Sequence, residues 1–164
     1  MKYYQHRFSD VESYLHHRSP YLLVDGIEKI EDNYVITRKV LESEMPVFQG
    51  HFPGAPIFPG AMMQEFLTQS AGVLIAANYN PMESYDTTDP NHNYYALGVL
   101  VKVESARYRQ FARPGDTLVG EVHLKDIAGS LFSFSGTLRV DDQVVLRIKF
   151  TLANIESSEL TRAR

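Results

Sequence analysis

The sequence contains no cysteine, and basic residues are in the minority. Without cysteine the chain cannot form disulfides, thiolate zinc sites or iron–sulfur clusters, and it has no cysteine nucleophile. This composition is compatible with the cytoplasm, where we expect the protein to reside. The 16 Lys and Arg residues against 20 Asp and Glu give a net charge of −4. Non-specific nucleic-acid binding needs a basic face, so we expect no nucleic-acid partner.

Long hydrophobic runs are also missing. Residues 1–7 lack the apolar stretch of a signal peptide. The longest apolar stretch, residues 71–77, is far shorter than the ~20 residues needed to span a bilayer. We therefore expect a soluble protein with no membrane span.

The remaining composition suits one folded domain. The chain has 164 residues, of which 44% are hydrophobic and 22% charged, as is typical of globular proteins. It shows no repeat and no linker, so residues 1–164 are expected to form a single domain. Residues 1–14 are predicted to be a leading segment, with a helix over residues 9–17 capped by Ser9 and Glu12. His16 and His17 are interpreted as solvated surface histidines.

Alternation of apolar and polar residues predicts strands in two parts of the chain. It is rough over residues 34–41 and clearer over residues 118–124, 132–140 and 146–152. Asp141, Asp142 and Gln143 lie between the last two runs and indicate a tight hairpin turn. The later half is thus predicted to be an antiparallel meander with one face toward water.

A long helix is predicted over residues 61–78, between Pro59-Gly60 and Asn80-Pro81. Apolar residues cover most of its circumference, which is typical of a buried helix. One helix buried against a curved antiparallel sheet is an α+β solution to layer packing. Residues 79–93 have no periodicity and are predicted to be a surface loop.

His51 is the one histidine of a loop, residues 50–60, that holds three glycines and three prolines. Desolvation by its apolar neighbours would favour the neutral imidazole, and a neutral imidazole can act as a base near neutral pH. Alternatively, His51 packs in the loop and fixes it by hydrogen bonds.

Glu65 is the only charged residue within residues 61–78. If it is buried it could serve as a general acid. Alternatively, Glu65, Thr68, Gln69 and Gly72 form a polar stripe that faces water. The Gly60 N–H, near the helix N-terminus, could stabilise an enolate-like oxygen, or Gly60 is part of an ordinary turn. Together these groups suit proton abstraction alpha to a carbonyl with loss of a beta leaving group.

Several ordered stretches of the chain resemble the motifs of the beta-hydroxyacyl-acyl-carrier-protein dehydratases of the FabZ/FabA type. The resemblance extends over residues 15–153, and the separations of His51 from Gly60 and from Glu65 fit the family. The matching stretches are residues 17–25 (HRSPYLLVD), 48–54 (FQGHFPG), 58–60 (FPG), 65–72 (EFLTQSAG), 106–109 (ARYR) and 114–116 (PGD).

The resemblance implies a hotdog fold, in which a curved sheet wraps the long helix. It also implies dimers with shared active sites, the histidine coming from one subunit and the acid from the other, and in many members a hexamer of three dimers. His51 would remove the alpha proton of a (3R)-3-hydroxyacyl thioester, and Glu65 would protonate the departing hydroxyl. The Gly60 N–H would hold the thioester carbonyl, and the product would be the trans-2-enoyl thioester. No metal or redox cofactor is needed.

The family's acyl carrier protein is the expected partner and carries the 3-hydroxyacyl group. Because the carrier is acidic, a basic patch is predicted at Lys102, Arg107, Arg109 and Arg113. Phe58 stands where the family usually has methionine. Phe58, Met62 and Phe66 are predicted to line the substrate tunnel. The pathway is expected to be fatty-acid synthesis or a specialised lipid, polyene or polyketide pathway.

Two other functions share the implied fold. An acyl-thioester hydrolase would use the carboxylate to activate water against the thioester carbonyl. A non-catalytic acyl-binding subunit would pair with an active partner. The His51 and Glu65 pair argues against both, since neither function needs an acid and a base at this spacing.

Overall fold

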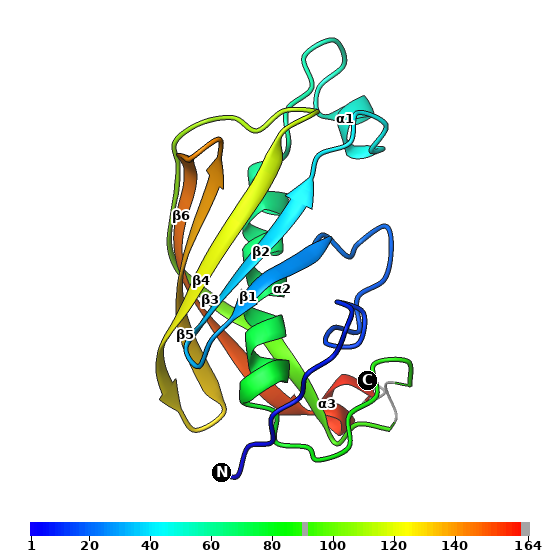
Figure 1. Cartoon of the computed structure of the whole chain (residues 1–164), viewed down its shortest axis with the longest axis vertical. Helices are drawn as coiled ribbons and strands as arrows, with labels where there is room; N and C mark the ends of the chain where they lie inside the picture. The colour runs from blue at the N-terminus through cyan, green and yellow to red at the C-terminus, as the bar shows by residue number, and fades with distance from the viewer. Residues whose placement is uncertain (90–91, 162–164) are drawn as a thin grey trace.

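The computed structural model describes residues 1–89 and 92–161. Its centre is a long helix, α2 (Gly60–Asn78), which lies in the hollow of one curved sheet (Figure 1). The six strands of that sheet follow the order β1-β2-β4-β5-β6-β3, and every neighbouring pair is antiparallel. The structure therefore confirms the predicted α+β arrangement of a buried helix and a curved antiparallel sheet.

Each segment predicted as a strand or as the long helix is present in the structure. The structure adds two strands and two short helices that were not predicted from the sequence. The strands are β1 (Gly26–Ile30), β2 (Tyr34–Val40), β3 (Tyr95–Tyr108), β4 (Thr117–Ala128), β5 (Leu131–Val140) and β6 (Gln143–Glu156), and the short helices are α1 (Val47–Gly50) and α3 (Ser157–Thr161). No helix in the described ranges is long and apolar enough to cross a bilayer.

The helix and the sheet approach each other closely at a small residue. A Cβ atom added to Gly120 of β4 would lie 2.8 Å from the Phe66 ring of α2, closer than real Cβ contacts allow. Phe66 and Leu67 are fully buried against this face. Inward-facing residues of β4, β5 and β6 complete the core, which explains why α2 carries apolar residues on nearly all sides.

The tight turn between β5 and β6 lies where it was predicted. Asp141 and Asp142 have φ angles of 46° and 63°, both in the left-handed region. Val140 and Gln143 pair across the turn. Two central residues with positive φ match the twist of the flanking strands, which is why this turn closes a hairpin.

The helix predicted over residues 9–17 is wrong. Ser9 does not cap a helix; instead the Asp10 carboxylate accepts hydrogen bonds from the Ser13 N–H (2.8 Å) and the Ser13 hydroxyl (2.9 Å). The N–H of Leu15 bonds to the Val11 carbonyl and closes a single turn. Aspartate can bond the backbone locally, and here that local bonding replaces a longer helix.

Residues 79–93 contain no helix or strand in their described part, and residues 90 and 91 lie outside the described residues. The segment is less exposed than predicted, since Asn80, Thr87 and Asn93 are buried. The Thr87 hydroxyl donates to the Glu12 carbonyl, so the loop satisfies backbone groups of the leading segment. The sequence analysis took polar residues without periodicity to be exposed. In the structure such residues are buried because they satisfy backbone groups of another loop.

Candidate active site

Glu65 lies on α2 beside a cavity of about 420 Å³, and its side chain is 22% exposed. The Gln69 amide donates to Oε1 of Glu65 (2.9 Å) and the Thr68 hydroxyl donates to Oε2 (3.2 Å). Residues three and four positions apart share a helix face, which places both donors at the carboxylate. Thr68 and Gln69 are themselves buried, so the alternative of a polar stripe facing water is wrong.

Gln69 also fixes the leading part of the chain to the helix. Its Oε1 accepts from the Leu23 N–H (2.8 Å), and its amide donates to the Tyr21 carbonyl (2.9 Å) as well as to Glu65. Gln69 is 2% exposed, and each of its polar atoms has a partner in this network. Residues 21–23 and the Glu65 carboxylate are therefore held by the same side chain.

The walls of the cavity come from several parts of the chain. Glu65, Gln69 and Gly72 of α2 form one side, and residues 96–100 of β3 form another. Residues 14–21 contribute Tyr14, Leu15, His16, His17 and Tyr21, and Leu160 of α3 also lines the cavity. Most of this lining is aliphatic or aromatic, as in sites that hold an apolar ligand.

His51 is held on a different segment, the loop that follows α1. Its Nδ1 lies 2.9 Å from the Ile57 carbonyl oxygen, and the Ile57 N–H donates back to the His51 carbonyl (2.9 Å). A carbonyl can only accept, so Nδ1 carries the hydrogen and Nε2 keeps a free lone pair. The ring also stacks on Phe52 with 4.1 Å between centroids. These contacts fix the orientation of the His51 ring, and His51 is not among the described residues that line the Glu65 cavity.

Gly60 is the first residue of α2, and its N–H has no partner within the helix. A Cβ atom at this position would lie 2.9 Å from the ring of Tyr108, at the end of β3. Any larger residue would push that ring away. The helix N-terminus can therefore offer a backbone N–H to an oxygen ligand while Tyr108 packs against it.

His17 was predicted to be solvated, but the structure places it at Glu65. Its Nε2 lies 3.9 Å from Glu65 Oε1, and its side chain is 37% exposed. Burial lowers the pKa of His17, more than the Glu65 carboxylate raises it. The neighbouring His16 points elsewhere, with Nε2 at 2.9 Å from the Asn93 amide. Its position at the start of the HRSPYLLVD stretch was the sequence signal that could have identified His17.

The family of the chain follows from sequence comparison. A family model described as the FabA-like domain matches residues 15–149. The chain belongs to the FabA-like family. A relative from Coxiella burnetii named 3-hydroxyacyl-[acyl-carrier-protein] dehydratase FabZ is 35% identical over 140 residues, covering 85% of this chain and 92% of that protein. A FabZ from Thermotoga petrophila is 35% identical over 143 residues, covering 87% and 93%.

Solved structures agree on the fold of this FabA-like chain. The dehydratase heterocomplex ApeI:P from Xenorhabdus doucetiae aligns with a TM-score of 0.73 at 20% identity, over 94% of this chain and 96% of that one. A hypothetical thioesterase with coenzyme A from Streptococcus pneumoniae aligns with a TM-score of 0.58 at 13% identity, over 80% and 85%. These neighbours confirm the hotdog fold, and since dehydratase and thioesterase share it, the fold alone does not select the reaction.

The residues predicted to line a tunnel in this FabA-like chain occupy different environments. Phe58 and Phe66 are 1% and 0% exposed and belong to the core, with the Phe58 ring 6.2 Å from that of Phe48. Met62 is half-buried at the edge of the same core. None of the three is among the described residues that line the cavity beside Glu65. Their role as tunnel residues stays a prediction.

The four cations predicted to contact a carrier lie on β3 and in the loop after it. Lys102, Arg107, Arg109 and Arg113 are all exposed. Lys102 forms an ion pair with Glu104 (3.9 Å), and the Arg113 guanidinium lies 5.5 Å from the centre of the Phe111 ring. Their exposure leaves them accessible, and their role in carrier binding stays a prediction.

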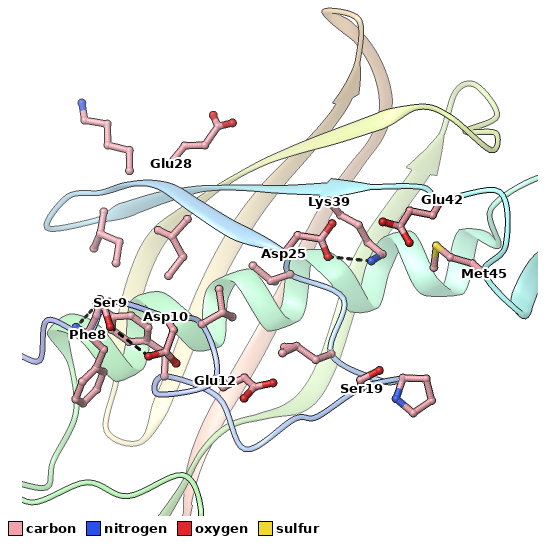
Figure 2. Close-up of a pocket in the computed structure, with 18 of the residues that line it drawn as sticks. Phe8, Ser9, Asp10, Glu12, Ser19, Asp25, Glu28, Lys39, Glu42 and Met45 are labelled. Carbon is pink, nitrogen blue, oxygen red and sulfur yellow. Dashed lines mark hydrogen bonds and ion pairs between the residues drawn. The ribbon is translucent and has the colours of Figure 1, made fainter.

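A larger hollow, of about 1060 Å³, lies between the leading segment and strands β1 and β2 (Figure 2). Carboxylates of Asp10, Glu12, Glu28 and Glu42 border it, and Asp25 pairs there with Lys39 at 3.2 Å. None of the predicted site residues is among the described residues that line this hollow. We therefore place the candidate active site at the smaller cavity. Across the described ranges, no three His, Asp or Glu side chains gather to hold a metal ion.

Proposed function

We propose that this FabA-like chain dehydrates (3R)-3-hydroxyacyl thioesters, carried on acyl carrier protein, to trans-2-enoyl thioesters. Its relatives from Coxiella burnetii and Thermotoga petrophila are named for this activity. The observation that carries the proposal is the presence of a histidine and a glutamate, His51 and Glu65, at the positions of the family's motifs. His51 presents a free Nε2, and Glu65 presents a carboxyl group to an apolar cavity.

His51 acts as the base in this proposal. Its Nε2 removes the proton from the alpha carbon, which the thioester carbonyl already acidifies. The hydrogen bond from Nδ1 to the Ile57 carbonyl (2.9 Å) keeps the reactive tautomer and stabilises the imidazolium as it forms. The Gly60 N–H, at the start of α2, donates a hydrogen bond to the thioester carbonyl oxygen and stabilises its developing negative charge.

Glu65 acts as the acid. The electrons of the alpha C–H bond form the new double bond while the beta C–O bond breaks, and Glu65 gives its proton to the departing hydroxyl. Water leaves, His51 releases its proton and Glu65 recovers one. The bonds from Thr68 and Gln69 orient the carboxyl group toward the cavity side of α2.

We also propose that the complete site needs a second copy of the chain. Strand β3 is an edge strand of 14 residues, and Leu100, Val101 and Tyr108 on it are exposed. A long edge with exposed apolar side chains favours pairing with another strand. Residues 96–100 of the same strand line the Glu65 cavity. A copy paired there could bring its His51 to this cavity, and further stacking of such dimers would give a hexamer.

The cavity beside Glu65 is the place that we propose for the acyl chain, because its lining is largely aliphatic and aromatic. The acyl carrier protein would dock on the exposed cations of β3 and the following loop. A cytoplasmic location and the choice between fatty-acid and specialised lipid, polyene or polyketide synthesis remain predictions from the sequence.

Incubation with (3R)-3-hydroxybutyryl and longer 3-hydroxyacyl thioesters tests the function. We expect enoyl absorbance to rise without release of free thiol. Free thiol without enoyl product would instead identify a hydrolase, for which the structural likeness to the Streptococcus pneumoniae thioesterase offers only a shared fold. Binding without either product would identify an acyl-binding subunit.

A further inference from the structure

The gap between His17 and Glu65 has the size that one oxygen atom requires. Nε2 of His17 lies 3.9 Å from Oε1 of Glu65, which is too long for a direct hydrogen bond. An oxygen placed about 2.8 Å from each atom would bond to both, since hydrogen bonds of that length close a triangle over the gap. Both atoms belong to one chain and border the same cavity.

The surroundings of His17 decide which ring nitrogen carries hydrogen. Nδ1 is buried and has no hydrogen-bond partner among the described residues. An N–H at Nδ1 would be a buried donor without an acceptor, which is costly. The neutral ring therefore carries its hydrogen on Nε2, the nitrogen that faces Glu65. Burial, which lowers the pKa of His17, keeps the ring in this neutral form.

His17 is also fixed in place rather than free on the surface. Its ring stacks on Tyr21 with 5.7 Å between centroids and 24° between planes. The guanidinium of Arg18 donates to the carbonyl of Leu15 (2.7 Å) and to that of Thr87 (3.2 Å), which pins the segment around His17. The charged and titratable groups that face His17 are Glu65, Arg18, His16 and Tyr21.

We propose that His17 is a further catalytic residue, which donates a hydrogen bond from Nε2 to the departing hydroxyl oxygen. This inference rests on the proposed dehydration. The oxygen lies between His17 Nε2 and Glu65 Oε1 as the beta C–O bond breaks. Glu65 supplies the proton that turns the hydroxyl into water, while the His17 N–H stabilises the negative charge that develops on the oxygen before the proton arrives. His17 itself gains and loses no proton.

Hydroxide must be protonated as it leaves, whereas chloride leaves without a proton. A substrate with a chloride leaving group therefore distinguishes a hydrogen-bond donor to the hydroxyl from a residue that only supports the structure. The test compares elimination from 3-hydroxybutyryl and 3-chlorobutyryl thioesters of N-acetylcysteamine, each corrected for its uncatalysed rate. His17→Phe keeps an aromatic ring for Tyr21 but has no N–H. We expect it to slow the hydroxy substrate at least ~10-fold, since loss of one such donor costs up to ~10²–10³-fold. The chloro substrate should react within about threefold of the wild-type rate.

His17→Gln provides the converse change, because it retains an N–H donor and lacks the ring. We expect it to retain more activity on the hydroxy substrate than His17→Phe. His92→Gln is the matched control, since this exposed histidine bonds to Ser84 and does not line the Glu65 cavity. It should leave the ratio of the two substrate rates unchanged.

The outcomes distinguish this inference from the function on which it rests. Equal slowing of both substrates by His17→Phe, or a higher activity in His17→Phe than in His17→Gln, would overturn the donor role. Glu65→Gln should show the same selective loss on the hydroxy substrate, whereas His51→Ala should slow both. If Glu65→Gln retains the wild-type rate on the hydroxy substrate, the proposed function fails. If only His17→Phe retains that rate, the inference about His17 alone fails.

Discussion

At the scale of single residues, His51 and Glu65 are held by different kinds of contact. His51 is fixed by the backbone of its own loop, through the Ile57 carbonyl and N–H. Glu65 is fixed by two side chains of its own helix, and one of these, Gln69, also bonds to the backbone of Tyr21 and Leu23. The proposed base is therefore part of a self-contained loop, while the orientation of the proposed acid depends on the packing of residues 21–23 against α2.

We predict a steep loss of turnover in His51→Ala and in Glu65→Gln, with the fold intact. Positioned acid–base groups typically contribute ~10²–10⁴-fold, and neither side chain belongs to the buried hydrophobic core. Steady-state rates with a 3-hydroxyacyl thioester and thermal unfolding curves give the two readouts. His92→Ala and Glu83→Gln make the same chemical changes at exposed positions and should retain activity. Activity within threefold of wild type in either site variant would remove that residue from the mechanism.

The sequence marked His51, Gly60 and Glu65 as candidates, because loop composition and the lone charge of a helix are visible in it, and their roles stay predictions. It did not mark His17 as a candidate. The interpretation of His17 as solvated relied on a helix over residues 9–17, and the local bonds of Asp10 to Ser13 replace that helix. The sequence also could not show which ring nitrogen of His51 keeps a free lone pair. That depends on the hydrogen bond to the Ile57 carbonyl, which forms only in the folded loop.

At the scale of elements, the predictions succeeded where the periodicity was regular. The long helix begins one residue before its predicted start and ends where predicted. Strand β3 was missed although apolar residues occupy every second position from 95 to 103, a pattern that the sequence analysis did not use. In the structure three register shifts interrupt its pairing with β6. Its side chains are half-buried or exposed throughout, so the alternating positions do not face a buried core. The five-residue strand β1 is too short to show a period.

The hairpin turn between β5 and β6 offers a test of the structure that is independent of function. Asp141 and Asp142 both have positive φ, which costs less for Asn and least for Gly. We expect the double replacement Asp141→Asn and Asp142→Gly to raise the free energy of unfolding by roughly 0.5–1 kcal/mol. Urea unfolding curves of the wild type and the double variant measure this change in the free energy of unfolding. The same replacement should lower stability if the turn had ordinary negative φ angles.

The cavity between α2 and β3 leads to a prediction about acyl selectivity. Leu97 of β3 lines this cavity, so Leu97→Phe should narrow it and shift the preference toward shorter acyl chains. Each methylene excluded is worth ~0.8 kcal/mol at most, so the shift should be several-fold per two carbons. Turnover measured over a series of saturated 3-hydroxyacyl thioesters gives the profile.

Phe58→Met is the matched comparison for that series. Phe58 lies in the core and not on the cavity wall. If the profile moves toward longer chains in Phe58→Met and stays fixed in Leu97→Phe, the acyl chain follows the tunnel predicted from the sequence, and the cavity is not its site.

At the scale of the whole molecule, the exposed cations of β3 predict how the substrate is delivered. Charge reversal at Arg107 or Arg109 should raise KM for a substrate on acyl carrier protein and leave KM for a small thioester unchanged. Both residues are exposed, so little effect on stability is expected. Lys149→Glu, on the neighbouring strand β6, is a control for a general change in charge. Equal effects on both substrates would show that the arginines support structure.

The arrangement of the whole molecule supports the proposal that a second copy of the chain completes the site. Glu65 lines its cavity, and His51 is not among the described residues there. The cavity borders β3, which ends the sheet as a long edge strand. Assembly cannot be read from periodicity, and the sequence indicated it only through resemblance to a family.

A mixed dimer tests the central claim, that His51 of one subunit and Glu65 of another form one dehydratase site. His51→Ala and Glu65→Gln chains with different affinity tags are refolded together, and the doubly tagged species is purified. We predict that each parent is nearly inactive and that the mixed species regains about one working site per dimer, roughly half the wild-type rate. A mixed species as inactive as its parents, beside an active wild-type protein refolded in the same way, would contradict the shared site.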